Sequence, residues 1–230
     1  MARAEFATPR RALVAGASGL VGQALLHRLL ASPDYVEVHA LVRRLPLDDD
    51  PHPKLQVHPV DFTHLSALPA VDDVFIALGT TIKQAGSQEA FRRVDFEAVV
   101  GTARAAHAAG ARRLLVVSAL GADADSRVFY NRVKGEMEHA VTSLGYATVV
   151  LAQPSLLLGD REALGQPSRA GEAWAIGLFK PVLKWLPAGV RPIPADTVAA
   201  ALVASALQSP PGVTVLKSAR MQQRRPPNPT

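Results

Sequence analysis

The chain has 230 residues, of which 48% are hydrophobic, 20% are charged and none is cysteine, and its formal net charge is +5. This length predicts a single α/β domain with a substantial core, and the lack of cysteine excludes disulfides, cysteine nucleophiles and thiolate metal sites. No run reaches the roughly 18 consecutive apolar residues of a membrane-spanning helix, and residues 1–11 lack the hydrophobic core of a signal peptide. We therefore expect a cytoplasmic protein.

Apolar runs alternate with helical patterns along the chain, which predicts an α/β fold with a doubly wound parallel sheet, a Rossmann fold covered by helices on both faces. A first strand ends at Ala15, and a helix with Leu25, Leu26 and Leu29 on one face follows it. Further strands are expected at residues 36–42, 55–60, 74–78, 114–117, 148–151 and 212–216. Helices are expected at 87–109, at 130–144 and in the alanine-rich stretch that ends at 208.

Three glycines, Gly16, Gly19 and Gly22, follow the first strand at intervals of three and open the first helix. The first would allow a tight turn, the second a close approach of the backbone to phosphate oxygens, and the third close packing of helix on sheet. Unpaired N–H groups at the start of the helix would favour an anion. The pattern predicts a dinucleotide site, and its alternative is a glycine-rich turn without a ligand.

The second expected strand ends in Arg43-Arg44, where an acidic residue would bind the adenine-ribose hydroxyl of NAD. Paired arginines suit a phosphate dianion instead. We therefore predict a preference for NADP(H), with NAD(H) as the second candidate. The alternative is that the two arginines only end a strand at the surface.

A possible catalytic group consists of Ser118, which follows the fifth strand, and Tyr130 and Lys134, which lie four residues apart on the next helix. The tyrosine hydroxyl could give or take a proton at a carbonyl, and an ammonium nearby would favour its phenolate form. The serine would hydrogen-bond the substrate oxygen. The alternative is a half-exposed tyrosine beside a solvated lysine.

Together with Asp61 and Gly79, these motifs resemble the short-chain dehydrogenase/reductase superfamily over residues 10–218. More narrowly, the chain resembles the atypical NAD(P)H-binding branch, which includes the Tat-interacting-protein-like oxidoreductases. The phrases that carry this narrower resemblance are Gly-Ala-Ser-Gly-Leu-Val-Gly, Ala-Leu-Gly-Thr-Thr, Phe-Arg-Arg-Val-Asp, Tyr-Asn-Arg-Val-Lys-Gly-Glu and Gly-Asp-Arg-Glu.

The resemblance implies a set of cofactor contacts at the carboxyl ends of the strands. The residues implied are Gly16, Ala17, Ser18, Gly19, Leu20 and Val21 at the pyrophosphate, Asp61 and Phe62 at adenine, Ala77, Leu78, Gly79 and Thr80 on the ribose side, and Pro154 and Ser155 at the nicotinamide. Ser118, Tyr130 and Lys134 would be catalytic, and Lys134 would also hold the nicotinamide ribose. Many extended members place an asparagine of the proton relay in the long helix, whereas this chain has Asp95 there.

These features predict an NADP(H)-dependent oxidoreductase that acts on the carbonyl/alcohol pair of an unknown small molecule. A second hypothesis is a non-catalytic NADPH sensor that presents a surface to a partner, and an epimerase or dehydratase is a third. Residues 1–218 are expected to form one NAD(P)-binding domain.

Within that domain, a substrate-covering segment is expected at about 155–195, where residues 173–186 carry both tryptophans. A lid is the favoured interpretation of that segment. An oligomer contact or a membrane-surface helix are its alternatives.

Other partners receive no support from the sequence. His52, His58 and His64 lack the spacing of a ligand set, so we expect no metal site. Residues 219–230 form a basic, proline-rich tail that is expected to be disordered. Because no nucleic-acid-binding motif accompanies this tail, we expect no nucleic-acid partner. The oligomeric state stays open.

Overall fold

The computed structural model describes residues 9–43, 52–158, 187 and 189–223. Seven parallel strands form one sheet in the order β3-β2-β1-β4-β5-β6-β9. The strands are β1 (Arg10–Ala15), β2 (Tyr35–Val42), β3 (Leu55–Pro59), β4 (Asp73–Ile76), β5 (Arg113–Val117), β6 (Thr148–Gln153) and β9 (Gly212–Lys217). This arrangement confirms the predicted doubly wound parallel sheet. The strand order reverses between β1 and β4, which is where such sheets bind ligands.

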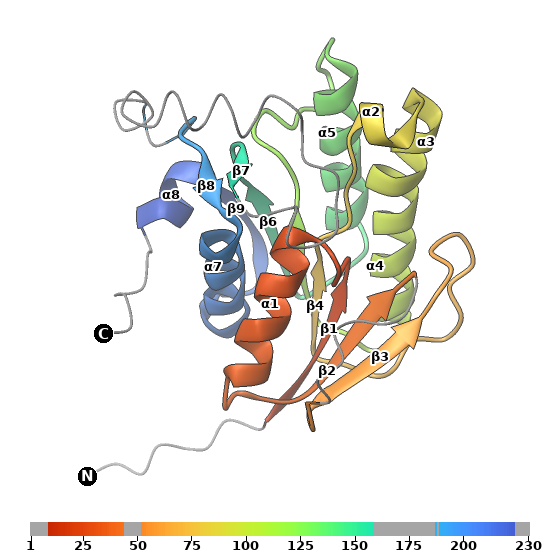
Figure 1. Cartoon of the computed structure of the whole chain (residues 1–230), viewed down its shortest axis with the longest axis vertical. Coiled ribbons are helices and arrows are strands. Elements are labelled where there is room, and N and C mark those ends of the chain that lie inside the picture. The colour runs from red at the N-terminus through yellow and green to blue at the C-terminus, as the bar shows by residue number, and fades with distance from the viewer. Residues whose placement is uncertain (1–8, 44–51, 159–186, 188, 224–230) are drawn as a thin grey trace.

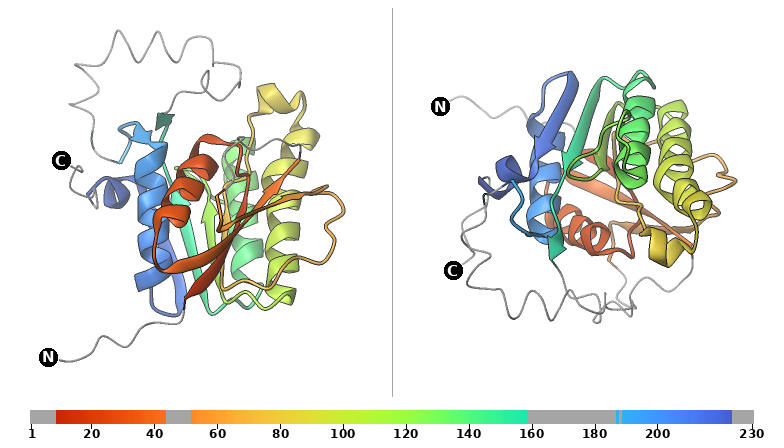
Figure 2. Two further views of the ribbon diagram at one scale, coloured as in Figure 1. Left: turned by 60° about the horizontal axis from the view of Figure 1, so that its bottom comes forward. Right: turned by 90° about the horizontal axis from the view of Figure 1, so that it is seen from above.

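Helices cover both faces of the sheet, as Figures 1 and 2 show. On one face α1 (Leu20–Ala31) packs beside α7 (Ala195–Gln208), and α4 (Val99–Ala108) and α5 (Phe129–Thr142) lie on the other. The remaining helical elements are α2 (Ile82–Ala85), α3 (Gln88–Arg92), the π-helix η1 (Arg93–Ala98) and α8 (Ser218–Gln223). A second, small parallel sheet pairs β7 (Leu157–Leu158) with β8 (Ile193–Pro194).

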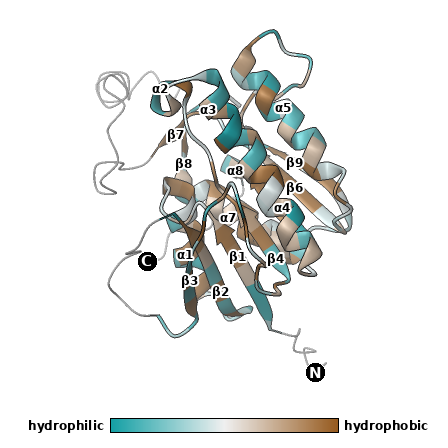
Figure 3. Ribbon diagram, turned by 90° about the vertical axis from the view of Figure 1, so that its right-hand side faces the viewer, coloured by the Kyte–Doolittle hydropathy of each residue, from teal (hydrophilic) through white to brown (hydrophobic). Residues whose placement is uncertain are grey.

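The core consists of two hydrophobic layers, one on each side of the sheet. Along β1, Ala12 and Val14 belong to the layer under α1 and α7, while Leu13 and Ala15 belong to the layer under α4 and α5. This alternation follows from the two-residue period of a strand that is buried on both faces. In Figure 3 the central strands are accordingly mostly hydrophobic, whereas the helices carry hydrophilic residues as well.

At the amino ends of the strands, a buried polar group links β1, β2 and β4. Asp73 is fully buried, forms an ion pair with Arg10 and accepts a hydrogen bond of 2.7 Å from the Tyr35 hydroxyl. Burial raises the pKa of Asp73 to about 6, even though both partners favour the carboxylate. Asp73, Arg10 and Tyr35 therefore satisfy one another.

Two sequence predictions need correction. The helix expected over 87–109 is not uniform, because η1 interrupts it between α3 and α4. Residues 219–223, expected to be disordered, belong to α8, because Met221 is fully buried in the core. The helix α7 begins after Pro194 without a side-chain cap, and Asp196 in its first turn forms an ion pair with Arg28. The tryptophan-bearing segment lies outside the described residues.

Candidate functional site

The first predicted site element is the turn between β1 and α1. Gly16 has a φ of +86°, and a Cβ there would lie 2.7 Å from the carbonyl carbon and oxygen of Ala77. Any residue other than glycine would therefore be strained and would also collide with the segment that follows β4. The Gly19 N–H donates to the Gly16 carbonyl over 3.0 Å and closes the turn.

The start of α1 fits an anion. A Cβ at Gly22 would lie 2.0 Å from the Gly16 oxygen, so α1 rests directly on the turn. At Gly19, the residue before the helix, a Cβ would meet only the Gly16 oxygen at 3.4 Å, so the fold itself requires glycine less strictly there. The helix has no side-chain cap and no acidic residue in its first turn. Its first N–H groups and its dipole are therefore available to a phosphate.

The remaining residues of this turn agree with that geometry. Ala17 is fully buried and Ser18 is exposed, while Leu20 and Val21 form the first turn of α1. The turn therefore offers backbone and small side chains to a ligand, as a pyrophosphate site requires.

The predicted adenine side lies at the ends of β2 and β3, which pair in parallel. Arg43 is exposed directly after β2, and Arg44 lies outside the described residues. Asp61 is exposed and accepts hydrogen bonds from Thr63, which hold the pKa of its carboxyl below the ordinary value. Phe62 is half-buried and packs against the core layer under α4.

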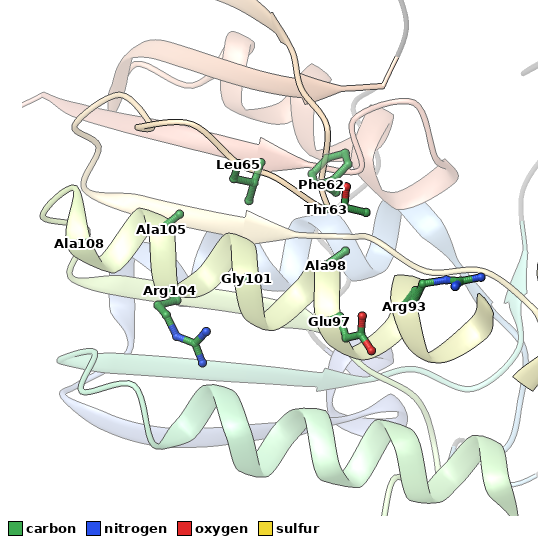
Figure 4. Close-up of a pocket in the computed structure, with 10 residues that line it drawn as sticks. All are labelled: Phe62, Thr63, Leu65, Arg93, Glu97, Ala98, Gly101, Arg104, Ala105 and Ala108. Carbon is green, nitrogen blue, oxygen red and sulfur yellow. The ribbon is translucent and has the colours of Figure 1, made fainter. Parts of the chain in front are cut away.

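A surface hollow of about 360 Å³ separates the loop after β3 from η1 and α4. Figure 4 shows Phe62 and Thr63 on one side of it and the small residues Ala98 and Gly101 on the other. The residues that line it are Phe62, Thr63, Leu65, Arg93, Glu97, Ala98, Gly101, Arg104, Ala105 and Ala108. Its floor is apolar and its rim carries charges of both signs.

The segment after β4 continues the same edge of the sheet. The Ala77 N–H donates to the Ala15 carbonyl over 2.8 Å, which joins this segment to the end of β1. Leu78 packs into the layer under α4. At Thr80 the backbone N–H donates to Asp95 Oδ2 over 2.8 Å.

The fold brings Lys134 to this segment through Asp95. Lys134 Nζ lies 2.7 Å from Asp95 Oδ1, and the two side chains are only 4% and 1% exposed. A Cβ at Gly79 would lie 3.4 Å from that carboxylate oxygen and 4.0 Å from Nζ. Sequence analysis noted Asp95 only as a departure from the family pattern and did not predict this ion pair. A charged residue on the buried side of a helix was the available signal, because a buried carboxylate needs a partner.

Ser118 and Tyr130 reach the same edge from β5 and α5. The Ser118 N–H donates to the Ala152 carbonyl over 2.7 Å, but its hydroxyl is buried and has no hydrogen-bond partner among the described residues. The half-buried ring of Tyr130 contacts the ring of Phe91 on α3, with centroids 5.4 Å apart. The buried hydroxyl is thus an unpaired polar group at the carboxyl end of a central strand.

The loop that joins these two elements is fixed against α5. A Cβ at Gly135 would lie 2.1 Å from the backbone nitrogen of Ala124, so loop and helix are in backbone contact. The Asp123 N–H also donates to the Asn131 carbonyl over 3.0 Å. This contact fixes α5, which carries Tyr130 and Lys134, relative to the loop that follows Ser118.

Pro154 and Ser155 follow β6 and make different hydrogen bonds within the protein. Pro154 is buried, and its carbonyl accepts from the Leu120 N–H over 2.9 Å. The Ser155 hydroxyl donates to the Arg191 carbonyl and lies 3.0 Å from Ser218 Oγ. The Ser155 hydroxyl and the Pro154 carbonyl are therefore both engaged within the protein.

A dinucleotide fits these residues. At Gly19 a Cβ would meet only the Gly16 oxygen at 3.4 Å, the start of α1 offers donors, and Ser118 Oγ is buried without a hydrogen-bond partner among the described residues. In the described part of the chain, no group of three or more His, Asp or Glu side chains is placed to hold a metal ion. None of the described helices is both long and apolar enough to cross a membrane.

Solved structures share this fold. A short chain dehydrogenase family protein from Francisella tularensis superposes with a TM-score of 0.65 at 14% identity, covering 94% of this chain and 100% of that one. The structure titled MoeE5 in complex with UDP-glucuronic acid and NAD superposes with a TM-score of 0.68 at 21% identity, covering 90% of this chain and 75% of the other. The fold is thus a Rossmann fold of the short-chain dehydrogenase/reductase type.

Family and sequence comparisons are more specific. Residues 16–156 match the model of the NAD(P)H-binding family. The mitochondrial protein FMP52 of Eremothecium gossypii is 36% identical over 152 residues, covering 66% of this chain and 68% of that protein. Its counterpart in Aspergillus fumigatus is 34% identical over 210 residues, covering 86% and 89%. The chain therefore belongs to the NAD(P)H-binding family.

The expected cytoplasmic location is contradicted by these comparisons. The relatives from Eremothecium gossypii, Emericella nidulans, Coccidioides immitis and Candida albicans are all named as mitochondrial proteins. The sequence argument failed because it rested on the lack of a secretory signal and of a membrane-spanning run. Neither of these distinguishes the cytoplasm from the mitochondrion.

Proposed function

We propose that the protein is an NADP(H)-dependent oxidoreductase that interconverts a carbonyl and an alcohol. The observation that carries this proposal is the buried hydroxyl of Ser118, which has no hydrogen-bond partner among the described residues. It follows β5 on the edge of the sheet that also carries the glycine turn, and α5 with Tyr130 and Lys134 is the next helix. A protein that only bound the nucleotide would not need an unsatisfied donor there.

Each of the three side chains has a proposed role at the substrate oxygen. Ser118 donates a hydrogen bond to that oxygen as negative charge develops on it. The Tyr130 hydroxyl gives its proton to the oxygen in reduction and takes it back in oxidation. Lys134 stabilises the phenolate left behind and binds the nicotinamide ribose. A bound nicotinamide supplies or accepts the hydride.

Binding of the cofactor is assigned to the glycine turn, with Phe62 beside the adenine. The preference for NADP(H) is assigned to Arg43, which is exposed where an acidic residue would favour NAD(H). A guanidinium there would pair with the 2′-phosphate of NADP(H). The hollow next to Phe62 supports a flat ring at this end of the sheet.

Fluorescence titration with NADPH and NADH tests the cofactor assignment. Arg43→Ala should lower the ratio of NADPH to NADH affinity about tenfold, the loss of about 1.4 kcal/mol from one charge-assisted contact. Arg112→Ala is the matched control, because Arg112 is exposed at the opposite end of the sheet. An affinity ratio that stays the same in Arg43→Ala would contradict the assignment.

A carbonyl panel distinguishes an enzyme from a sensor. In Tyr130→Phe, NADPH affinity should stay the same while turnover falls by about 100-fold or more, because the proton donor is lost. Tight NADPH binding by the unmodified protein without turnover of any panel member would instead favour the non-catalytic sensor.

A further inference from the structure

The buried ion pair between Asp95 and Lys134 leaves one carboxylate oxygen without a hydrogen bond. Asp95 Oδ2 accepts from the Thr80 N–H over 2.8 Å. Asp95 Oδ1 lies 2.7 Å from Lys134 Nζ, but this contact does not have the geometry of a hydrogen bond, and Oδ1 has no other partner among the described residues. Buried polar atoms are normally hydrogen-bonded, so Oδ1 is an acceptor that the protein itself does not use.

Gly79 leaves room beside both members of this ion pair. A Cβ at Gly79 would lie 3.4 Å from Asp95 Oδ1 and 4.0 Å from Lys134 Nζ. Apart from the chain neighbours of Gly79, no other heavy atom of the described residues lies within 4 Å of that point. The backbone of Gly79 does not have a positive φ, so other residues could adopt its conformation. Neither a strained turn nor close packing therefore requires a glycine here.

We propose that Asp95 and Lys134 together bind the two hydroxyls of the nicotinamide ribose, on the side of the ion pair that Gly79 leaves free. This inference rests on the proposed function, which assigns that ribose to Lys134 alone. An ammonium only donates hydrogen bonds, and a carboxylate only accepts them. A vicinal diol suits such a pair, because one hydroxyl accepts from Nζ while the other donates to Oδ1 in a charge-assisted hydrogen bond.

A purely structural role for Asp95 would account for less of this geometry. In that role the carboxylate would only balance the buried ammonium of Lys134 and accept from the Thr80 N–H. It would not require an unused acceptor, nor a missing side chain at Gly79. The two explanations differ in their consequences for ligands that lack the nicotinamide ribose.

Three nucleotides distinguish the explanations when their affinities are measured by isothermal titration calorimetry. NADPH carries both the nicotinamide and its ribose. The 2′-phosphate of ADP-ribose carries that ribose without the nicotinamide, and 2′,5′-ADP carries neither of them. A contact with the ribose should affect the first two ligands alike and leave the third unaffected, whereas a general disturbance of the fold should weaken all three.

The central variant is Asp95→Asn, which nearly preserves the shape of the side chain. Because the Thr80 N–H needs an acceptor, the amide oxygen should face Thr80, and the amide nitrogen then replaces Oδ1 beside Nζ. The affinities for NADPH and for the 2′-phosphate of ADP-ribose should fall about tenfold, through the loss of one hydrogen bond to a charged group. The affinity for 2′,5′-ADP should stay the same.

Asp196→Asn is the matched control for that variant. It makes the same chemical change in the exposed ion pair with Arg28 and should leave all three affinities unchanged.

Gly79→Ala covers the case in which Asp95→Asn does not fold. It keeps both buried charges, and its Cβ would make only ordinary contacts with them, so the variant should fold. The Cβ would occupy the space assigned to the ribose. The affinities for the two ligands that carry this ribose should therefore fall about tenfold, with no change for 2′,5′-ADP.

Equal losses for all three ligands in Asp95→Asn would show that the ion pair only supports the fold, and would overturn the proposal. Unchanged affinities for all three would also overturn it, in Asp95→Asn or, if that variant does not fold, in Gly79→Ala. In either case normal binding of NADPH by the unmodified protein would leave the proposed function standing. If the unmodified protein bound neither NADPH nor 2′,5′-ADP, the proposed function itself would fail.

Discussion

The contact between α1 and the glycine turn gives a prediction that can be worked out from a single distance. In Gly22→Ala, the new Cβ would lie 2.0 Å from the Gly16 oxygen, whereas real Cβ atoms essentially never come closer than 3.0 Å to another heavy atom. The obstructing atom is backbone, so α1 and the turn must separate by about 1 Å. Overpacking of this kind costs about 2 kcal/mol. In a chain of this length the melting temperature should fall by about 4–8 °C.

A second glycine provides a control, because the same substitution there should raise the stability of the protein instead of lowering it. Gly101 is the third residue of α4, which continues directly from η1, and a Cβ there would meet nothing within 4 Å. Gly101→Ala should therefore stabilise the protein by about 1 kcal/mol, the difference in helix propensity between the two residues. Both variants would be compared with the unmodified protein by thermal unfolding followed by circular dichroism. NADPH titration should show that Gly22→Ala also loses affinity, because the turn moves.

The reasoning would be refuted by a Gly22→Ala protein that melts at or above the temperature of the unmodified protein. Normal NADPH binding in a destabilised Gly22→Ala protein would contradict the location of the nucleotide site. A loss of both stability and binding in Gly22→Ala would support both arguments.

Two further predictions concern groups away from the proposed site. Asp73→Ala should lower the free energy of unfolding by about 3 kcal/mol in urea, because it leaves Arg10 and the buried Tyr35 hydroxyl without their partner; a loss below about 1 kcal/mol would contradict this. His39 is buried beside His58, and burial lowers its pKa from the ordinary 6.5. His39 therefore takes up a proton at higher pH in the unfolded chain than in the folded chain. The stability that neutral, buried His39 contributes is complete above pH 6.5. It is lost as the pH falls through the lowered pKa of the folded protein. His39→Gln should show a weaker loss of stability on acidification, and an equal loss in both proteins would count against the argument.

Much of the fold could be predicted because the relevant signals are local. A strand buried on both faces appears as a continuous apolar run, and Leu13 and Val14 belong to such a run although they point into different core layers. The glycine turn could also be predicted from the sequence. Gly22 is required by its contact with Gly16, six residues earlier, and Gly16 is required by its contact with Ala77, which follows the adjacent strand β4. In both cases the pattern and its physical cause lie close together in the sequence.

The features that sequence analysis missed depend on contacts between distant segments. Asp95 and Lys134 meet only because α5 packs on η1, and no spacing in the sequence reports that contact. The end of the ordered chain was placed too early, because Met221 is anchored by core residues from other elements and not by any local pattern. The ion pair between Asp196 and Arg28 likewise joins two helices that are far apart in the sequence.

The two ends of the sheet show why the carboxyl end is the one to test for chemistry. At the amino end, Asp73 is buried with two partners, and the group contributes to stability through satisfied contacts. At the carboxyl end, the Ser118 hydroxyl is buried and has no hydrogen-bond partner among the described residues. Burying a hydroxyl without a partner lowers the stability of the folded protein. Binding of a nucleotide explains the glycine turn, but it does not explain an unpaired hydroxyl next to a helix that carries a tyrosine and a lysine one turn apart. In the proposed function, a substrate oxygen would satisfy that hydroxyl.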